Sequence, residues 1–130
     1  MNIIIIVTLF LILGFASSSL AENIFEKDTI SSSPVNISVT FIAHGTLMME
    51  FDKTVVHIDP VGQYADYSKL PRADLILITH HHGDHLDKAA IGLIRKPDTD
   101  IILSELCTRE IKGGIVMKNG DSRRIIRKLR

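Results

Sequence analysis

The sequence contains a single cysteine, Cys107, so no disulfide can form within the chain. Cys107 follows an apolar run, and we expect a small buried group there rather than a catalytic or metal-binding thiol. The chain also lacks an excess of charge, since 15 basic residues balance 15 acidic ones. With 130 residues, of which 45% are hydrophobic and 23% charged, the composition indicates one globular domain and excludes a repeat protein, a coiled coil or a disordered tail.

No apolar run is long enough to cross a membrane comfortably, because the longest covers residues 3–15 and a membrane helix needs about 20 apolar residues. Ser19 and Ala21 supply the small residues that a signal peptidase requires, so residues 1–21 are predicted to be a signal peptide cleaved after Ala21. No lysine or arginine precedes the apolar run, which leaves an uncleaved anchor as the alternative. The domain is expected to be periplasmic or secreted, with membrane contact only through this segment.

Short apolar runs follow a polar stretch, residues 22–36, that we interpret as a linker. Residues 37–41 alternate apolar and polar side chains, which indicates a half-buried strand. Residues 47–51 and 54–58 are predicted to be the next two strands, so the three form a β-meander. An Asp-Pro pair then ends the third strand, because proline has no backbone N–H to donate to the hydrogen-bond ladder of a sheet.

A loop over residues 61–73 is predicted to lead into a continuous apolar run at residues 75–79, which indicates a strand buried on both faces. From Asp84 onward, apolar residues at helical spacing predict a helix that ends before Pro97. Its expected buried face consists of Leu86, Ala89, Ala90, Leu93 and Ile94. Three weaker predictions follow: a buried strand at residues 101–103, a helix at 105–112 and a short strand at 115–117.

Four possible metal ligands lie within six residues directly after the strand predicted at 75–79: His80, His82, Asp84 and His85. His80 and His82 are two residues apart, so on extended backbone they project from the same side and can bind one ion. Imidazole and carboxylate suit Zn²⁺ and also Fe or Mn. His-rich tracts can be loose metal-binding tails, but such tracts do not normally follow an apolar strand. His81 points to the opposite face and is not predicted to be a ligand.

The segment Thr79-His80-x-His82-x-Asp84-His85 resembles the H-x-H-x-D-H signature of the metallo-β-lactamase superfamily. Residues 39–51, 58–60 and 73–78 are similar as well, in particular to bacterial metal-dependent hydrolases related to ascorbate-phosphate lactonase and to the phospholipase D that cleaves N-acyl-phosphatidylethanolamine. The resemblance implies an α/β (α+β) fold, in which residues 37–122 form a partial metallo-β-lactamase domain, the amino-terminal half of a four-layer αββα sandwich.

The resemblance also implies two divalent metal ions, zinc in the first instance, with Mn or Fe as alternatives. His80 and His82 would bind one ion, and Asp84 and His85 the other. Asp84 would also act in catalysis by orienting a bridging hydroxide. Two ions can activate water and stabilise charge on both attacking and leaving oxygens. The expected substrate is a small-molecule or lipid-like ester, lactone or phosphodiester, and the motif does not choose among these.

Asp59 matches a family aspartate that supports the metal loop through hydrogen bonds, so we expect a second-shell role. His44, which precedes a glycine, matches a turn near the site, and either a second-shell or substrate contact or a structural histidine fits this position. His57 lies within a predicted strand and is interpreted as a packing residue.

Later ligands of the family are absent, because no histidine follows His85. This leaves an alternative to the hydrolase: a truncated, catalytically silent metal-binding fragment, or a half-domain that needs a partner chain. Residues 123–130, five of them basic, depart from the family pattern. They are interpreted either as a contact with an anionic membrane or nucleic acid, or as an out-of-frame or truncated end. We favour the latter and predict no nucleic-acid partner.

Overall fold

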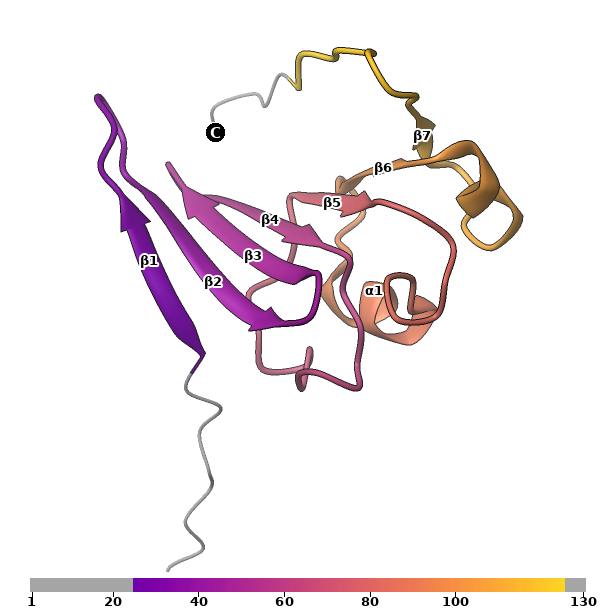
Figure 1. The fold of residues 1–130 in the computed structure, drawn as a ribbon, viewed down its shortest axis with the longest axis horizontal. Coiled ribbons are helices and arrows are strands. Elements are labelled where there is room, and N and C mark those ends of the chain that lie inside the picture. Colours follow the sequence, from indigo (N-terminus) through magenta and orange to yellow (C-terminus); the bar gives the residue numbers. More distant parts are fainter. Residues whose placement is uncertain (1–24, 126–130) are drawn as a thin grey trace, which may run out of the picture.

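The computed structural model describes residues 25–125, so the predicted signal peptide and most of the basic tail lie outside the described residues. Within residues 25–125, one sheet contains seven strands in sequence order (Figure 1). They are β1 (Glu26–Ile30), β2 (Ile37–Ala43), β3 (Thr46–Phe51), β4 (Thr54–Ile58), β5 (Leu75–Ile78), β6 (Asp100–Leu103) and β7 (Ile115–Val116). The same part of the chain holds one α-helix, α1 (Lys88–Ile94), and one 3₁₀ helix, η1 (Glu105–Arg109). None of its helices is long and apolar enough to span a bilayer.

The sheet has an antiparallel part and a parallel part. Strands β1 to β4 pair antiparallel, which confirms the predicted meander of β2, β3 and β4. Strands β4 to β7 pair parallel, and each parallel pair needs a crossover. The crossover between β5 and β6 contains α1, and the one between β6 and β7 contains η1. The chain thus changes from hairpin connections to crossover connections just before residues 79–87, which we call the histidine loop.

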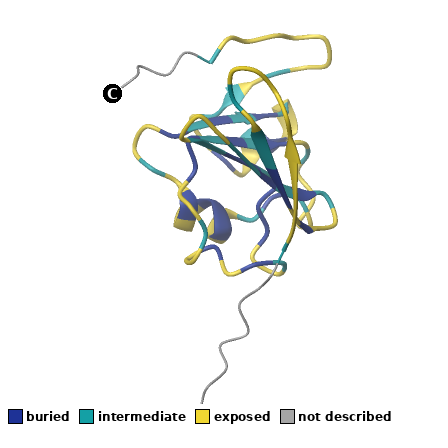
Figure 2. Cartoon of the chain, turned by 90° about the vertical axis from the view of Figure 1, so that its left-hand side faces the viewer, coloured by how far each residue is buried: buried dark blue, intermediate teal, exposed yellow. Residues whose placement is uncertain are grey.

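Strand β1 corrects the interpretation of residues 22–36 as a linker. Its five residues pair with β2, from Glu26 opposite Phe41 to Ile30 opposite Ile37. All five residues of β1 are exposed at the edge of the sheet (Figure 2). Because no face of this strand is buried, its sequence carries no apolar alternation, and the pairing rests on main-chain hydrogen bonds that composition does not reveal.

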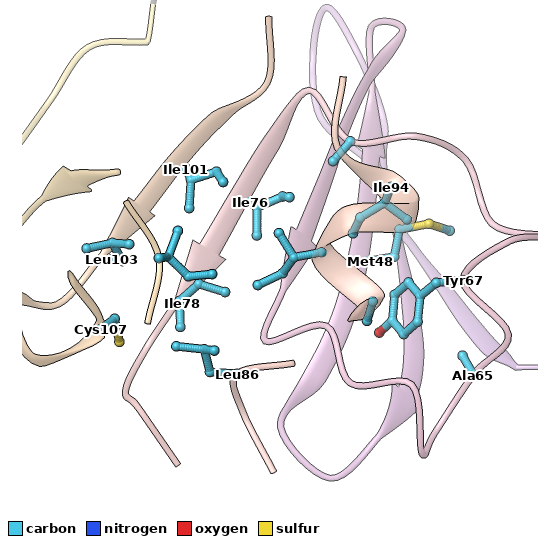
Figure 3. Packing of buried hydrophobic residues seen from close by; sticks show 14 of the residues in the cluster. Met48, Ala65, Tyr67, Ile76, Ile78, Leu86, Ile94, Ile101, Leu103 and Cys107 are labelled. Atoms are coloured by element: carbon cyan, nitrogen blue, oxygen red, sulfur yellow. The ribbon is translucent and has the colours of Figure 1, made fainter. Parts of the chain in front are cut away.

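One face of the sheet forms the core. The registers align one buried residue from each of five neighbouring strands in a row: Thr40, Met48, His57, Ile76 and Ile101. Helix α1 adds its buried side chains Ala90, Ile91 and Ile94 to the same cluster (Figure 3). Cys107 is fully buried at the edge of this cluster, as expected of a small apolar group.

Helix α1 differs from the prediction in both its start and its buried face. Asp87 caps the helix by accepting hydrogen bonds from the amides of Ala89 and Ala90, so regular helix begins at Lys88 rather than near Asp84. This start buries Ile91, whereas Leu93, predicted to be buried, is 52% exposed. The predicted helix at 105–112 is also shorter, since only the 3₁₀ turn η1 forms there.

The opposite face of the sheet is only half covered. A second cross-strand row consists entirely of apolar residues of intermediate or high exposure: Phe41, Leu47, Ile58, Leu77, Ile102 and Ile115. The prediction that residues 75–79 form a strand buried on both faces is therefore wrong for this face, because Leu75 and Leu77 are only partly buried whereas Ile76 and Ile78 are buried. Parallel strands are normally covered on both faces.

His57 is a structural histidine within the core. Its Nε2–H donates to the carbonyl of Pro71 at 2.9 Å, while its buried Nδ1 has no hydrogen-bond partner. This arrangement fits only the neutral ring, because a second N–H would be buried without an acceptor. Burial accordingly lowers the pKa of His57 from its ordinary value of 6.5.

We expect His57 to make the fold sensitive to mild acid. Because its pKa is lower in the folded chain, the unfolded chain binds more protons between the folded value and 6.5. The contribution of His57 to stability is complete above pH 6.5 and is lost as the pH falls toward its folded pKa, by about 1.4 kcal/mol for each unit of pKa difference. Urea unfolding at several pH values should show this loss, and a His57→Gln variant should show a shallower dependence. An identical slope in both proteins would contradict this assignment.

Candidate metal centre

The histidine loop follows β5 directly and ends at the cap of α1. Its turn is closed by two backbone hydrogen bonds to the carbonyl of His82, from the amide of His85 at 2.9 Å and from the amide of Leu86 at 2.8 Å. The Leu86 side chain is buried in the core, and Asp87 also accepts a hydrogen bond from the amide of Gly62. Both ends of the loop are therefore attached to the rigid part of the fold, so the exposed side chains between them are held in place.

The loop brings its four predicted ligands together in two groups. The ligand atoms of His80, His82 and Asp84 lie within 4.8 Å of one another, and so do those of His44, Asp84 and His85. Asp84 belongs to both groups. The ring centroids of His80 and His85 are 4.0 Å apart, so the two groups adjoin. Each group could hold a metal ion, and the two groups share the carboxylate of Asp84.

Asp59 lies directly beneath this loop, at the end of β4. Its carboxylate is almost completely buried and accepts three hydrogen bonds. The amide of Thr79 donates at 2.8 Å, the Thr79 hydroxyl at 2.6 Å and Nδ1 of His85 at 2.8 Å. A buried carboxylate requires such donors. The contacts are those expected of a residue that supports the metal loop.

These hydrogen bonds determine which nitrogen each histidine offers to an ion. Since the Thr79 hydroxyl donates its proton to Asp59, it accepts a hydrogen bond from Nδ1–H of His80 at 3.0 Å. His85 likewise donates through Nδ1. In the neutral form of both rings, Nε2 is then unprotonated, the form in which imidazole binds a metal. Asp59 and Thr79 together therefore orient the rings of the candidate ligands His80 and His85.

The lone pair on Nε2 of His85 faces negative charge. This nitrogen lies 3.6 Å from Oδ2 of Asp84. A neutral nitrogen lone pair and a carboxylate oxygen repel each other unless a cation or a proton lies between them. The residues present therefore fit a divalent cation: their donor atoms are imidazole nitrogens and a carboxylate oxygen, and two of the rings are oriented by hydrogen bonds on the far side.

Asp84 remains ionised well below neutral pH. A hydrogen bond from its own backbone amide is the largest influence that lowers the pKa of this carboxyl, and the nearby His85, His44 and His80 lower it further. The side chain is 51% exposed, so an ion can reach it from solvent. The central carboxylate of the site is thus both charged and accessible.

Gly45, in the turn between β2 and β3, allows the His85 ring to approach the backbone closely. A Cβ atom added at Gly45 would lie 2.9 Å from Cε1 of His85, closer than side-chain carbons normally approach. The next residue, Thr46, donates its buried hydroxyl to the carbonyl of Asp59 at 2.7 Å. The turn therefore packs against His85 of the histidine loop through Gly45. Through Thr46 it is hydrogen-bonded to Asp59, the residue that supports this loop.

We expect Gly45→Ala to lower metal affinity by about tenfold, because the new methyl group would displace a ring that Asp59 holds in position. Isothermal titration with Zn²⁺ would measure the change. Gly83→Ala is the matched control, since a Cβ at Gly83 meets nothing within 4 Å. Equal effects of the two substitutions would contradict the role of Gly45.

The remaining histidines take no part in these groups. His57 is buried in the core, and the ring of His81 lies beside that of His82, with centroids 4.8 Å apart. The sequence interpretation did not single out Thr79 as a functional residue. Its position between a buried strand and the first histidine is the signal that could have identified it, because a hydroxyl there can bond both neighbours.

Residues 38–120 match a family described as the beta-lactamase superfamily domain. A crystal structure of a protein from Parabacteroides distasonis ATCC 8503, assigned as a metal-dependent hydrolase, is 46% identical in sequence with a TM-score of 0.73. The similarity covers 75% of this chain and 45% of that one, so the chain spans less than half the length of that protein. The mixed sheet with few helices agrees with the metallo-β-lactamase fold predicted from the sequence. The chain belongs to the β-lactamase superfamily.

Proposed function

We propose that this chain provides the metal-binding part of a metal-dependent hydrolase that acts on an ester, a lactone or a phosphodiester. The observation that carries the proposal is the convergence of His80, His82, Asp84 and His85 above a buried carboxylate that orients two of them. The kinship with a protein assigned as a metal-dependent hydrolase supports the same reaction class.

The ligand set favours zinc, with manganese or iron as alternatives, because it combines imidazole nitrogens with one carboxylate. When bound, two such ions supply an activated water and stabilise charge on the attacking and leaving oxygens. The chain's own residues contribute positioning: Asp59 fixes His85, and Thr79 fixes His80. Asp84, ionised and shared by both groups, would accept a hydrogen bond from the attacking water.

The substrate belongs to a small-molecule or lipid-like class in this proposal, and its reactive group reaches the site from solvent. His82 and Asp84 are exposed, and nothing in residues 25–125 covers them. We further propose that the domain works in the periplasm or outside the cell. Amino-terminal sequencing of the mature protein should then begin at Glu22, whereas a start at Met1 would favour a membrane anchor.

A second candidate is a catalytically silent half-domain that needs a partner chain. The half-covered apolar row on the far face of the sheet favours it, because surfaces of this kind are normally packed. The related crystal structure contains more than twice the matched length of chain, which is consistent with further elements over that face.

Hydrolysis assays separate the two candidates. The purified chain would be loaded with Zn²⁺ and tested on bis-p-nitrophenyl phosphate, a p-nitrophenyl ester and a γ-lactone. A hydrolase should turn over one of them, lose the activity in His82→Ala or with a chelator, and keep it in the matched variant His81→Ala. Tight metal binding without turnover of any substrate would favour the silent half-domain. A chain that binds no metal would exclude a hydrolase that acts without a partner.

A further inference from the structure

A histidine outside the signature loop completes one of the two groups. His44 lies in the turn between β2 and β3, far from the loop in sequence, yet its Nε2 is 3.3 Å from Oδ2 of Asp84. Its ring centroid is 5.2 Å from that of His85. The group of His44, Asp84 and His85 therefore contains two imidazole nitrogens close to the same carboxylate oxygen.

Two of the distances in this group match the edge lengths of a metal coordination shell. Zinc bonds of about 2.0–2.2 Å at tetrahedral angles place neighbouring ligand atoms about 3.3–3.6 Å apart. The two nitrogen–oxygen separations here are 3.3 Å for His44 and 3.6 Å for His85. At 3.6 Å, the contact between Nε2 of His85 and Oδ2 of Asp84 is longer than a hydrogen bond, so a direct hydrogen bond does not account for it.

The backbone of the turn is shaped to present His44 to the loop. His44 adopts a φ of 53°, a left-handed conformation that is uncommon for residues other than glycine but tolerated by histidine. The adjoining Gly45 lets the turn lie against His85, and the Thr46 hydroxyl bonds the carbonyl of Asp59. One residue, Asp59, thus anchors both the turn that carries His44 and the ring of His85.

Within residues 25–125, no other histidine lies in this group: His80 and His82 belong to the other group, His57 is buried in the core, and His81 lies in neither group. With His44, the described residues offer three donors to one ion, the number typical of catalytic zinc sites.

We propose that His44 is a direct protein ligand of a divalent cation, together with Asp84 and His85, rather than a second-shell or substrate-contacting residue. The inference rests on the proposed function, since it concerns one ion of the same centre. It adds that the hairpin of β2 and β3, and not only the histidine loop, forms part of that centre.

Titration of the full chain with Co²⁺ and Zn²⁺ tests this proposal independently of activity. The variant is His44→Asn, because asparagine accommodates a positive φ and so preserves the turn. His81→Asn is the matched control from neither group. We expect His44→Asn to weaken binding of one ion roughly 100-fold or more and to change the visible absorption of bound Co²⁺, since loss of a direct ligand should exceed the 10–100-fold effect of outer-shell changes. His81→Asn should leave both unchanged.

The outcomes distinguish this proposal from the proposed function. If wild type and His44→Asn bind both ions with equal affinity and give the same Co²⁺ spectrum, His44 is only an ion-pair partner of Asp84, and the inference is overturned while the hydrolase proposal stands. If wild type itself binds no ion, both fail. Unfolding curves recorded without metal should coincide for wild type and variant, and a His44→Cys variant should regain tight binding through a thiolate.

Discussion

An Asp59→Asn variant is expected to bind zinc about 10–100-fold more weakly than wild type and to unfold more easily. The carboxylate of Asp59 is the common acceptor for Thr79 and His85, and through the Thr79 hydroxyl it also orients His80. An amide in its place presents two N–H groups, so at least one buried donor would face another donor. Each such unsatisfied buried group costs about 1–3 kcal/mol.

Zinc titration and urea unfolding of Asp59→Asn would measure the two effects separately. Thr99→Val is the control for stability alone, because the buried Thr99 hydroxyl donates to the carbonyl of Ala73 and Thr99 belongs to neither ligand group. Loss of this buried hydrogen bond should cost about 1–3 kcal/mol without changing the metal affinity of the folded chain. Unchanged zinc affinity in Asp59→Asn would show that the hydrogen bonds beneath the loop do not prepare its ligands.

Replacing Asp84 by asparagine should have the largest effect on metal binding of any single substitution, because Asp84 belongs to both ligand groups. Asparagine keeps the size of the side chain but removes the negative charge that offsets a divalent ion. We expect the affinity for both ions to fall roughly 100-fold or more, beyond the effect of changing a residue that only supports a ligand. Hydrolysis should be lost together with metal binding.

The stability of the fold should change little in Asp84→Asn, since this side chain is 51% exposed and caps no helix. Equilibrium dialysis followed by metal analysis would measure binding, and circular dichroism would confirm folding. Asp66→Asn serves as the control, because Asp66 is an exposed carboxylate whose partners are Ser68 and Lys69. Loss of only one ion in Asp84→Asn would contradict its shared position.

The parts of the fold that sequence predicted well are those in which one segment carries an apolar run of its own. Strands β2 and β4 could be found because they form short apolar or β-branched runs between turns. The alternation in β2 did not predict the core face, because Thr40 is buried in the core and Phe41 is 41% exposed on the half-covered face. Strand β1 has no buried face, so nothing in its composition distinguishes it from a linker. The buried face of α1 could not be predicted without knowing which aspartate caps the helix. Asp87 rather than Asp84 is the cap, so Ile91 is buried instead of Leu93.

The candidate site was likewise predicted where its residues are close together in the sequence and missed where the fold brings distant residues together. The four loop residues are local, so their spacing and their position after an apolar strand made them visible in the sequence. The place of His44 depends on the pairing of β2 with β3 and on close packing at Gly45, which are long-range properties. Thr79 acts through the direction of one hydroxyl proton, which becomes clear only when Asp59 is seen beside it.

The metal content of the purified chain tests the central claim most directly. Wild type and a variant with His80, His82, Asp84 and His85 all replaced by alanine would be loaded with Zn²⁺, desalted and analysed by inductively coupled plasma mass spectrometry. We predict that wild type retains about two equivalents of zinc, as a two-metal centre requires, and that the variant retains none. Equal zinc content in the two folded proteins would contradict a metal centre in the histidine loop.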